Sequence, residues 1–161
     1  IKEMAEEISK DYAGKDLLVV GILKGSVLFT SDLIKNITIP CEIDFMAVSS
    51  YGNSAQTSGV VRILKDLDSD IENKHVLIVE DIVDTGTTLS YLLEYLKARK
   101  AASIEIVALL DKEARRTSNI SAKYKGFDVP DEFIVGYGID YAEKYRNLPF
   151  IGALKEEIYN K

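Results

Sequence analysis

Acids and a loop of glycine and threonine stand next to one another in the middle of the chain. The apolar run at residues 76–79 leads directly into Glu80 and Asp81, and residues 84–88 read Asp-Thr-Gly-Thr-Thr. Such a loop supplies free backbone N–H groups, hydroxyl groups and a helix N-terminus, which together suit a phosphate group. Each charge-assisted hydrogen bond to that phosphate would contribute ~1.5–3 kcal/mol. The adjacent acids repel phosphate but suit ribose hydroxyls or a magnesium ion.

Three other interpretations fit parts of this segment. A capped helix, with Asp84 or Thr85 as the cap, would explain the threonines and the glycine but not three acids that repel one another at the end of a strand. Residues 84–87 also spell an aspartic protease motif, but that site needs two aspartates from two such loops, and the chain has one copy followed by a helical pattern. Residues 78–81 look like the acidic pocket of a phosphorylation receiver domain, which carries that strand at its start rather than in mid-chain.

The elements that must position these residues follow from the apolar pattern. Apolar runs typical of strands occur at residues 17–23, 42–48, 60–65, 76–79 and 104–110. Apolar residues at helical spacing predict helices at residues 4–12, 26–35 and 88–98. Between them, residues 49–59 are polar without any period, and short apolar runs near the end occupy residues 133–135 and 150–154.

This order of elements predicts an α/β fold. We expect a mainly parallel twisted sheet flanked by helices, with an antiparallel flap around the polar stretch at residues 49–59. In such sheets, ligands bind outside the carboxyl ends of the strands, near a switch in strand order. Functional side chains are therefore expected directly after the apolar runs.

The composition excludes several classes of function. The chain has 161 residues, 47% of them hydrophobic and 29% charged, which predicts one globular domain with a sizeable core. A single cysteine, Cys41, and a single histidine, His75, leave no internal disulfide and no histidine-rich metal site. The formal net charge of −6 argues against a protein that coats nucleic acid. Without a membrane-length apolar run or a signal peptide, we expect a cytoplasmic protein.

Residues 76–88 resemble the signature that binds phosphoribosyl pyrophosphate (PRPP) in the type I phosphoribosyltransferases: an apolar strand, two acids, then Asp-Thr-Gly-Thr-Thr. Further segments resemble the hypoxanthine(-guanine) phosphoribosyltransferases in particular and follow one another in the order of that family. They are Leu-Lys-Gly at residues 23–25, Ser-Ser-Tyr-Gly at 49–52, Lys112, Phe-Ile-Val-Gly-Tyr-Gly-Ile-Asp-Tyr at 133–141 and Arg-Asn-Leu-Pro at 146–149.

This resemblance implies a fold and an activity. The fold is that of a type I phosphoribosyltransferase, with residues 1–161 as one domain, a core at about residues 14–125, and a small hood from the N-terminal helix and residues 126–161. Family members usually begin somewhat earlier than this chain, so we expect part of the hood to precede Ile1. The activity is magnesium-dependent purine salvage, in which PRPP and hypoxanthine or guanine give IMP or GMP and pyrophosphate. Partners would be these substrates and further copies of the chain, as a dimer or tetramer, with neither nucleic acid nor membrane.

The same resemblance implies roles at the phosphate end of the site. Glu80 and Asp81 would hold the ribose hydroxyls and a metal ion, and Asp140 would bind a second magnesium. The residues around the 5'-phosphate would be Asp84, Thr85, Gly86, Thr87 and Thr88. The pyrophosphate would be bound by Lys24, Gly25 and Arg146. In many members of the family the peptide bond that corresponds to Leu23–Lys24 is cis.

Five residues are implied at the purine base. Asp84 would exchange a proton with N7, Lys112 would donate to the 6-oxo group, Phe133 would stack on the ring, and the Ile134 backbone and Asp140 would meet its edge. On the residues alone, a core aromatic is slightly favoured for Phe133. Lys112 could be a solvated loop residue and Arg146 a surface arginine.

The polar loop is expected to be a lid that begins at Ser50 and Tyr51 and excludes water from the reaction. A bare hairpin tip is the alternative. Two other functions stay open beside the salvage transferase. One is a regulator that keeps the fold but senses nucleotides or binds nucleic acid, and the other is a transferase for adenine or another base.

Overall fold

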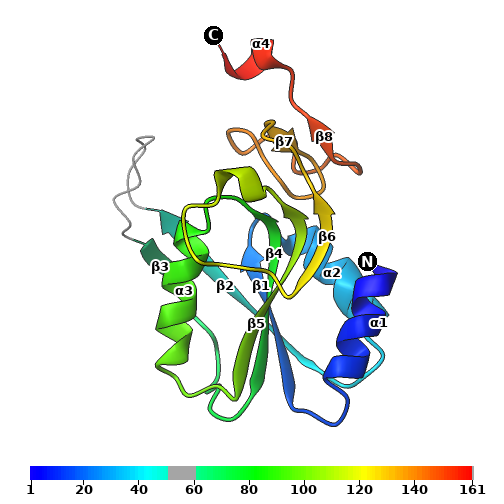
Figure 1. The fold of residues 1–161 in the computed structure, drawn as a ribbon, viewed down its shortest axis with the longest axis vertical. Coiled ribbons are helices and arrows are strands. Elements are labelled where there is room, and N and C mark those ends of the chain that lie inside the picture. The colour runs from blue at the N-terminus through cyan, green and yellow to red at the C-terminus, as the bar shows by residue number, and fades with distance from the viewer. Residues whose placement is uncertain (51–60, 161) are drawn as a thin grey trace.

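A six-stranded sheet runs through the middle of the computed structural model, which describes residues 1–50 and 61–160 (Figure 1). The strand order is β3-β2-β1-β4-β5-β6, and every neighbouring pair is parallel except the antiparallel pair β2–β3. The strands are β1 Leu17–Leu23, β2 Glu42–Ser50, β3 Val61–Lys65, β4 His75–Val83, β5 Ser103–Asp111 and β6 Tyr124–Asp128. The predicted mainly parallel sheet with an antiparallel flap strand is thus confirmed.

Both faces of the sheet are covered by helices, which explains the continuous apolar runs of β1 and β4. Alternate residues of each strand enter opposite cores, because side chains point to the two faces of a strand in turn. On one face, Leu77 and Val79 lie in a core with Phe29 of α2 (Val27–Asn36). On the other, Val76 and Ile78 lie in a core with the leucines of α3 (Thr87–Lys97).

The N-terminal helix α1 (Lys2–Asp11) belongs to the core layer, which corrects its predicted place in the hood. Its buried side chains Met4, Ala5 and Ile8 share a core with Phe29 and Leu33 of α2. Figure 1 shows α1 beside α2, at the opposite end of the molecule from the C-terminal elements. The Tyr124 hydroxyl also donates to Asp11 Oδ2 at 2.7 Å, so that α1 is tied to strand β6, which the apolar pattern had not predicted.

The hood consists of the segment that follows β6. A two-stranded antiparallel sheet, β7 (Ile134–Val135) with β8 (Gly152–Ala153), and a short helix α4 (Glu156–Tyr159) lie beyond the carboxyl ends of the main strands (Figure 1). Because β6 pairs in parallel with β5, the sheet extends to Asp128 rather than ending near residue 125. Ligand-binding side chains from the core can therefore face those of the hood.

Strand β4 is longer than its apolar run predicts. Its ladder with β5 continues through the pairs Glu80↔Ala108 and Ile82↔Leu110, so both acids lie within the strand rather than after it. At the flap, β2 ends at Ser50, while Tyr51 and the rest of the expected lid lie outside the described residues. Within the described part of the chain, no helix has the length and apolar character needed to cross a membrane.

Candidate active site

The loop after β4 ends at the N-terminus of α3 and lines a cavity of about 230 Å³. Residues of the predicted phosphate loop lie around it together with one of the two acids: Glu80, Asp84, Thr85, Gly86 and Thr88. Gly86 is the N-cap of α3, with φ of 84°, and neither Asp84 nor Thr85 occupies that position. The capped-helix interpretation of these two residues is therefore wrong. Thr87 is the first residue of the helix, and its backbone N–H donates to Thr85 Oγ1 at 3.4 Å.

Glu80 and Asp81 are half-buried, and neither forms an ion pair within the described residues. Burial raises the pKa of Glu80 well above its usual range, and the neighbouring Asp81 charge raises it further. Burial also raises the pKa of Asp81, although the Ile82 N–H, 2.6 Å from Asp81 Oδ1, acts in the opposite direction. A bound cation would reduce the electrostatic repulsion between two carboxyl groups that lie this close together.

The predicted pyrophosphate loop lies against these acids. A Cβ atom on Gly25 would come within 2.0 Å of Asp81 Oδ2, so any larger residue here would force the Asp81 carboxylate to move. The Leu23–Lys24 peptide bond is cis, as the resemblance implied. The loop therefore places its backbone, rather than a side chain, beside the acid pair.

Lys24 and Arg146, which are far apart in the sequence, meet at a single carboxylate. Lys24 Nζ lies 3.1 Å from Glu143 Oε2, and Arg146 Nη2 lies 3.1 Å from Glu143 Oε1. Arg146 also donates to the Gly138 carbonyl at 2.8 Å and lies 3.5 Å from Asp140. The two predicted pyrophosphate ligands are thus brought together. Their hydrogen bonds to the Glu143 carboxylate, that of Lys24 being the larger cause, lower the pKa of Glu143. No sequence signal singled out Glu143, which lies in an irregular hood turn.

A second cavity, of about 350 Å³, lies between the core and the hood. It shares Ile82 and Asp84 with the first, and four predicted base-site residues line it: Lys112, Phe133, Ile134 and Asp140. The Lys112 side chain is 8% exposed and its Nζ lies 3.9 Å from Asp84 Oδ2, so it is not the solvated loop residue of the alternative interpretation. Its backbone N–H donates to the Val83 carbonyl at 2.9 Å.

Phe133 forms part of the wall of this second cavity. The residue is 38% exposed, its ring is stacked on Tyr159 at 5.1 Å between centroids, and Tyr141 meets it edge-on at 5.3 Å. It is therefore not the core aromatic that the residues alone allowed. The ring offers an apolar surface on which a flat heterocycle could stack.

Arg115 is a cavity residue that the sequence analysis missed. Its Nε lies 3.2 Å from Asp84 Oδ1, and its Nη1 lies 3.5 Å from Asp131 Oδ1 across the cavity. Asp84 therefore faces two cations, Lys112 and Arg115. The signal that could have found Arg115 is its position three residues after Lys112, in the same short turn after β5.

The carboxylates predicted to bind metal lie in two places. Glu80 lines the first cavity, whereas Asp140 lines the second and accepts from the Glu143 N–H at 2.8 Å. The hard oxygen donors of Glu80 and Asp81, half-buried and without an ion-pair partner among the described residues, fit a magnesium ion.

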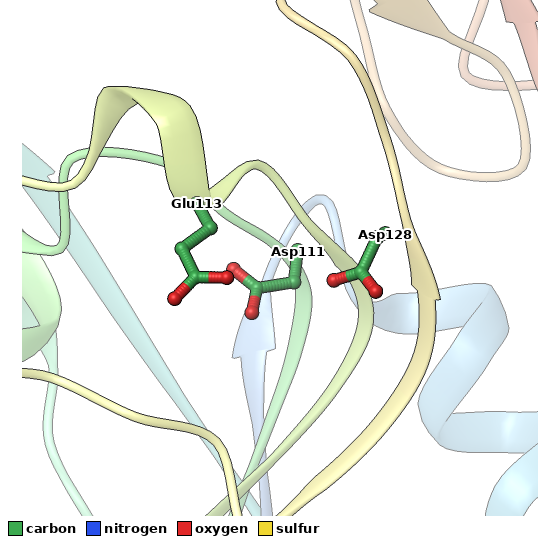
Figure 2. Close-up of side chains that lie close together, drawn as sticks. All are labelled: Asp111, Glu113 and Asp128. Atoms are coloured by element: carbon green, nitrogen blue, oxygen red, sulfur yellow. The ribbon is translucent and has the colours of Figure 1, made fainter.

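Three other acids gather within metal-binding distance in the described chain, namely Asp111, Glu113 and Asp128. Figure 2 shows the Asp111 side chain between the other two. Arg116 pairs with Asp111, and Lys125 Nζ lies 2.8 Å from Asp128 Oδ1, so basic side chains already balance much of this charge. This cluster is structural in character and is separate from the predicted metal ligands.

Comparison with known proteins agrees with this geometry. The model of the phosphoribosyl transferase domain family matches residues 1–142. The chain is 58% identical over 159 residues to the hypoxanthine-guanine phosphoribosyltransferase of Staphylococcus aureus strain Mu50, covering 99% of this chain and 89% of that protein.

Solved structures give the same result. A crystal structure of a hypoxanthine phosphoribosyltransferase from S. aureus has a TM-score of 0.96 at 58% identity, covering 99% of this chain and 87% of that one. A hypoxanthine-guanine phosphoribosyltransferase from Bacillus anthracis, with HEPES in its active site, has a TM-score of 0.91 at 49% identity, covering 96% and 91%. With its signature loop, its fold and its two adjoining cavities, the chain belongs to the phosphoribosyltransferase family, in the group of the hypoxanthine-guanine phosphoribosyltransferases.

Proposed function

We propose that this site transfers the phosphoribosyl group of PRPP to N9 of a 6-oxopurine, giving IMP or GMP and pyrophosphate in purine salvage. The observation that carries the proposal is that a phosphate-loop cavity and a cavity walled by an aromatic ring adjoin at Asp84. A nucleotide product has these two halves, a ribose phosphate and a flat base. The family membership and the close structural relatives support the same reaction.

The phosphate half of the site would bind the sugar and the leaving group. The backbone N–H groups and hydroxyls of residues 85–88 bind the 5'-phosphate, and Glu80 and Asp81 bind the ribose hydroxyls. Lys24, the Gly25 backbone and Arg146 bind the pyrophosphate. Metal dependence is general in this family, and we infer magnesium, which would be held by Glu80 and Asp81 and, at a second position, by Asp140. When bound, it supplies positive charge to the pyrophosphate and ribose oxygens.

The base half would set both the substrate class and the proton transfer. Phe133 stacks on the purine, while Lys112 donates to its 6-oxo group and the Ile134 backbone and Asp140 meet its edge. As the bond from N9 to the ribose carbon forms, the bond from that carbon to pyrophosphate breaks and the pyrophosphate oxygen keeps the electron pair. The Asp84 carboxylate takes up the proton that the purine loses at N7. The lid that begins at Ser50 and Tyr51 excludes water during this step.

A product assay tests the proposal directly. PRPP and Mg²⁺ are supplied with hypoxanthine, guanine, xanthine or adenine in turn, and nucleotide and pyrophosphate are quantified. We expect IMP or GMP with an equal amount of pyrophosphate. Nucleotide binding without turnover of any base would instead favour the regulatory alternative, and efficient use of adenine would favour the adenine transferase.

We also propose that the enzyme acts in the cytoplasm as a homo-oligomer, a dimer or a tetramer. Exposed Val27 and Leu28 at the start of α2 support association, since apolar side chains on a helix face favour burial against another protein. Sedimentation analysis is expected to give two or four times the mass of one chain, and a monomer at micromolar concentration would contradict this.

A further inference from the structure

Arg116 lies behind the signature loop, where the sequence analysis assigned no function. Its side chain is 13% exposed, and all three guanidinium nitrogens face protein acceptors. Nε donates to the Asp84 carbonyl at 3.1 Å, and Nη1 donates to the Ile120 carbonyl at 2.7 Å. Nη2 pairs with the Asp111 carboxylate.

Two of these three acceptors, Asp84 and Asp111, lie on the two segments that carry the base-facing side chains. Asp84 follows β4, whereas Asp111 ends β5 immediately before Lys112. One rigid, planar guanidinium therefore joins the backbone of Asp84 to the residue next to Lys112. A backbone hydrogen bond also connects these two segments: the Lys112 N–H donates to the Val83 carbonyl at 2.9 Å.

The two residues after Arg116 support the phosphate loop from the same side. The Thr117 N–H and the Ser118 hydroxyl each donate to the Thr85 carbonyl at 3.0 Å. A Cβ atom on Gly86 would lie 2.2 Å from Ser118 Oγ, which shows how closely the two loops are packed. The segment from Arg116 to Ser118 thus fixes the loop that carries Asp84.

A direct role for Arg116 in ligand binding does not fit these contacts. Arg115 lines the base cavity, whereas in the described structure Arg116 is absent from the lining of both cavities. Its three nitrogens are already engaged with Asp84, Ile120 and Asp111. Any effect of Arg116 on catalysis must therefore act through the residues that it holds.

We propose that Arg116 is a positioning residue that sets the spacing between Asp84 and Lys112, an inference that rests on the proposed function of that pair. O6, which accepts a hydrogen bond, and N7, which carries the proton that Asp84 takes up, are neighbouring positions on one edge of a 6-oxopurine. The groups that meet them, Lys112 Nζ and Asp84 Oδ2, must therefore be placed relative to each other, and they lie 3.9 Å apart. Arg116, paired with Asp111 and bonded to Asp84, holds that spacing before the base arrives.

The test is Arg116→Lys, which keeps the charge and can still pair with Asp111 but cannot donate to three acceptors as a planar fork. We expect a cooperative thermal transition, a fall in kcat with hypoxanthine of roughly 10- to 100-fold, and a KM for PRPP within about threefold of wild type, because small misplacements of reacting groups act on the chemical step. The preference for hypoxanthine over adenine, as a ratio of kcat/KM, should fall as well. A purely structural role would leave that ratio unchanged.

Arg99→Lys is the matched control. Arg99 also pairs with a carboxylate, lying 2.8 Å from Asp66, but in the described structure it lines neither cavity. This variant should keep kcat and base preference. If Arg116→Lys does not fold, Asp111→Asn replaces it as the test. This variant removes the charge of the carboxylate that pairs with Arg116 but keeps an oxygen that can accept from it, and kcat and base preference are measured in the same way.

Folded Arg116→Lys with wild-type kcat and base preference would overturn the positioning role. Asp84→Asn and Lys112→Ala are measured alongside. If those two variants also behave like wild type, the proposed function of the pair has failed. If they lose activity or selectivity while Arg116→Lys does not, the positioning inference alone has failed.

Discussion

Asp84 is the residue at which the two halves of the site meet, since it lines both cavities and faces Lys112 and Arg115. A carboxylate between a phosphate loop and an aromatic wall can contact a base in one cavity while it stays next to a ribose phosphate in the other. Its neighbour Lys112 is almost fully buried although its sequence context reads as a loop. A buried ammonium is costly unless it has a partner, and the Asp84 carboxylate, 3.9 Å from Lys112 Nζ, supplies one in the described structure.

Asp84→Asn is expected to fold normally and to lose roughly 10²- to 10⁴-fold in kcat, because the amide cannot exchange a proton. Steady-state and single-turnover kinetics with hypoxanthine measure the loss. Asp16→Asn is the matched control, since Asp16 is exposed before β1, at the opposite end of the sheet. Near-normal turnover of Asp84→Asn would remove the acid–base role.

Lys112→Ala is expected to narrow the gap between hypoxanthine and adenine. Lysine has donors and no acceptor, so it fits a 6-oxo group and not a 6-amino group. A site built on such a hydrogen bond can reject the mismatched analogue by ~10⁴-fold, whereas an apolar slot reaches only ~10²-fold. The measurement is kcat/KM for both bases, with exposed Lys97→Ala as control. Wild-type use of adenine within about tenfold of hypoxanthine, a gap of ~1.4 kcal/mol, would show that the 6-oxo assignment is wrong.

Among the elements, the buried strands were predictable because their apolar runs are long and continuous, as in β1 and at residues 106–110 of β5. Strand β6 was not, since Tyr124–Asp128 buries little beyond Tyr124 and forms by pairing with β5. The place of α1 depends on tertiary contacts that no local pattern encodes. The signature loop was predictable because its chemistry lies within one short segment. Arg115 and Glu143 were not, since each becomes a site residue only when loops from different elements meet.

The turn that carries Glu143 and the loop that carries Lys24 are joined by an exposed ion pair. Under the proposed function, Glu143 would compete with pyrophosphate for Lys24 and Arg146. Glu143→Gln should therefore lower the KM for PRPP by about two- to fivefold, the range expected for an exposed pair. The difference should shrink at high salt. Glu94→Gln, which loses an exposed pair with Lys97 on α3, is the control. An unchanged or higher KM would show that Glu143 does not compete.

The base of the flap depends on Asp44, whose side chain is 10% exposed. Burial acts to raise the pKa of Asp44, but hydrogen bonds from the Asp68 and Phe45 N–H groups and from Lys65 outweigh it and lower the pKa. A carboxyl group with a lowered pKa stabilises the fold at pH values above its unfolded pKa of ~4, and this contribution is lost as pH falls through the folded value.

Asp44→Asn is therefore expected to reduce the free energy of unfolding by ~1–3 kcal/mol at pH 7, and its difference from wild type should narrow below about pH 4. Urea unfolding at several pH values measures both effects. Asp68→Asn, at a side chain 74% exposed, should change stability by less than ~0.5 kcal/mol. A constant difference between Asp44→Asn and wild type at all pH values would contradict the lowered pKa.

At the scale of the whole molecule, a cation has to be brought to an acidic chain that binds an anionic substrate. Under the proposed function, the half-buried acids Glu80 and Asp81, whose pKa values are raised by burial, would hold that cation. We expect EDTA to abolish activity and Mg²⁺ to restore it, and PRPP with Mg²⁺ to raise the melting temperature more than PRPP with EDTA. Glu80→Gln should weaken that magnesium-dependent stabilisation, while Glu72→Gln, at an exposed position before β4, should keep it. Full activity in chelator would reject the metal.

The segments that form this site are synthesised in a fixed order, from the N-terminus to the C-terminus. Once Asp128 has been added, all six strands of the main sheet exist, and so do the residues that line the phosphate cavity. The hood wall of the base cavity, from Asp131 to Tyr159, is still to come. The residues that line the phosphate cavity are therefore all synthesised before the segment that closes the base cavity. Residues 131–159 complete the cavity that the proposed function assigns to the purine.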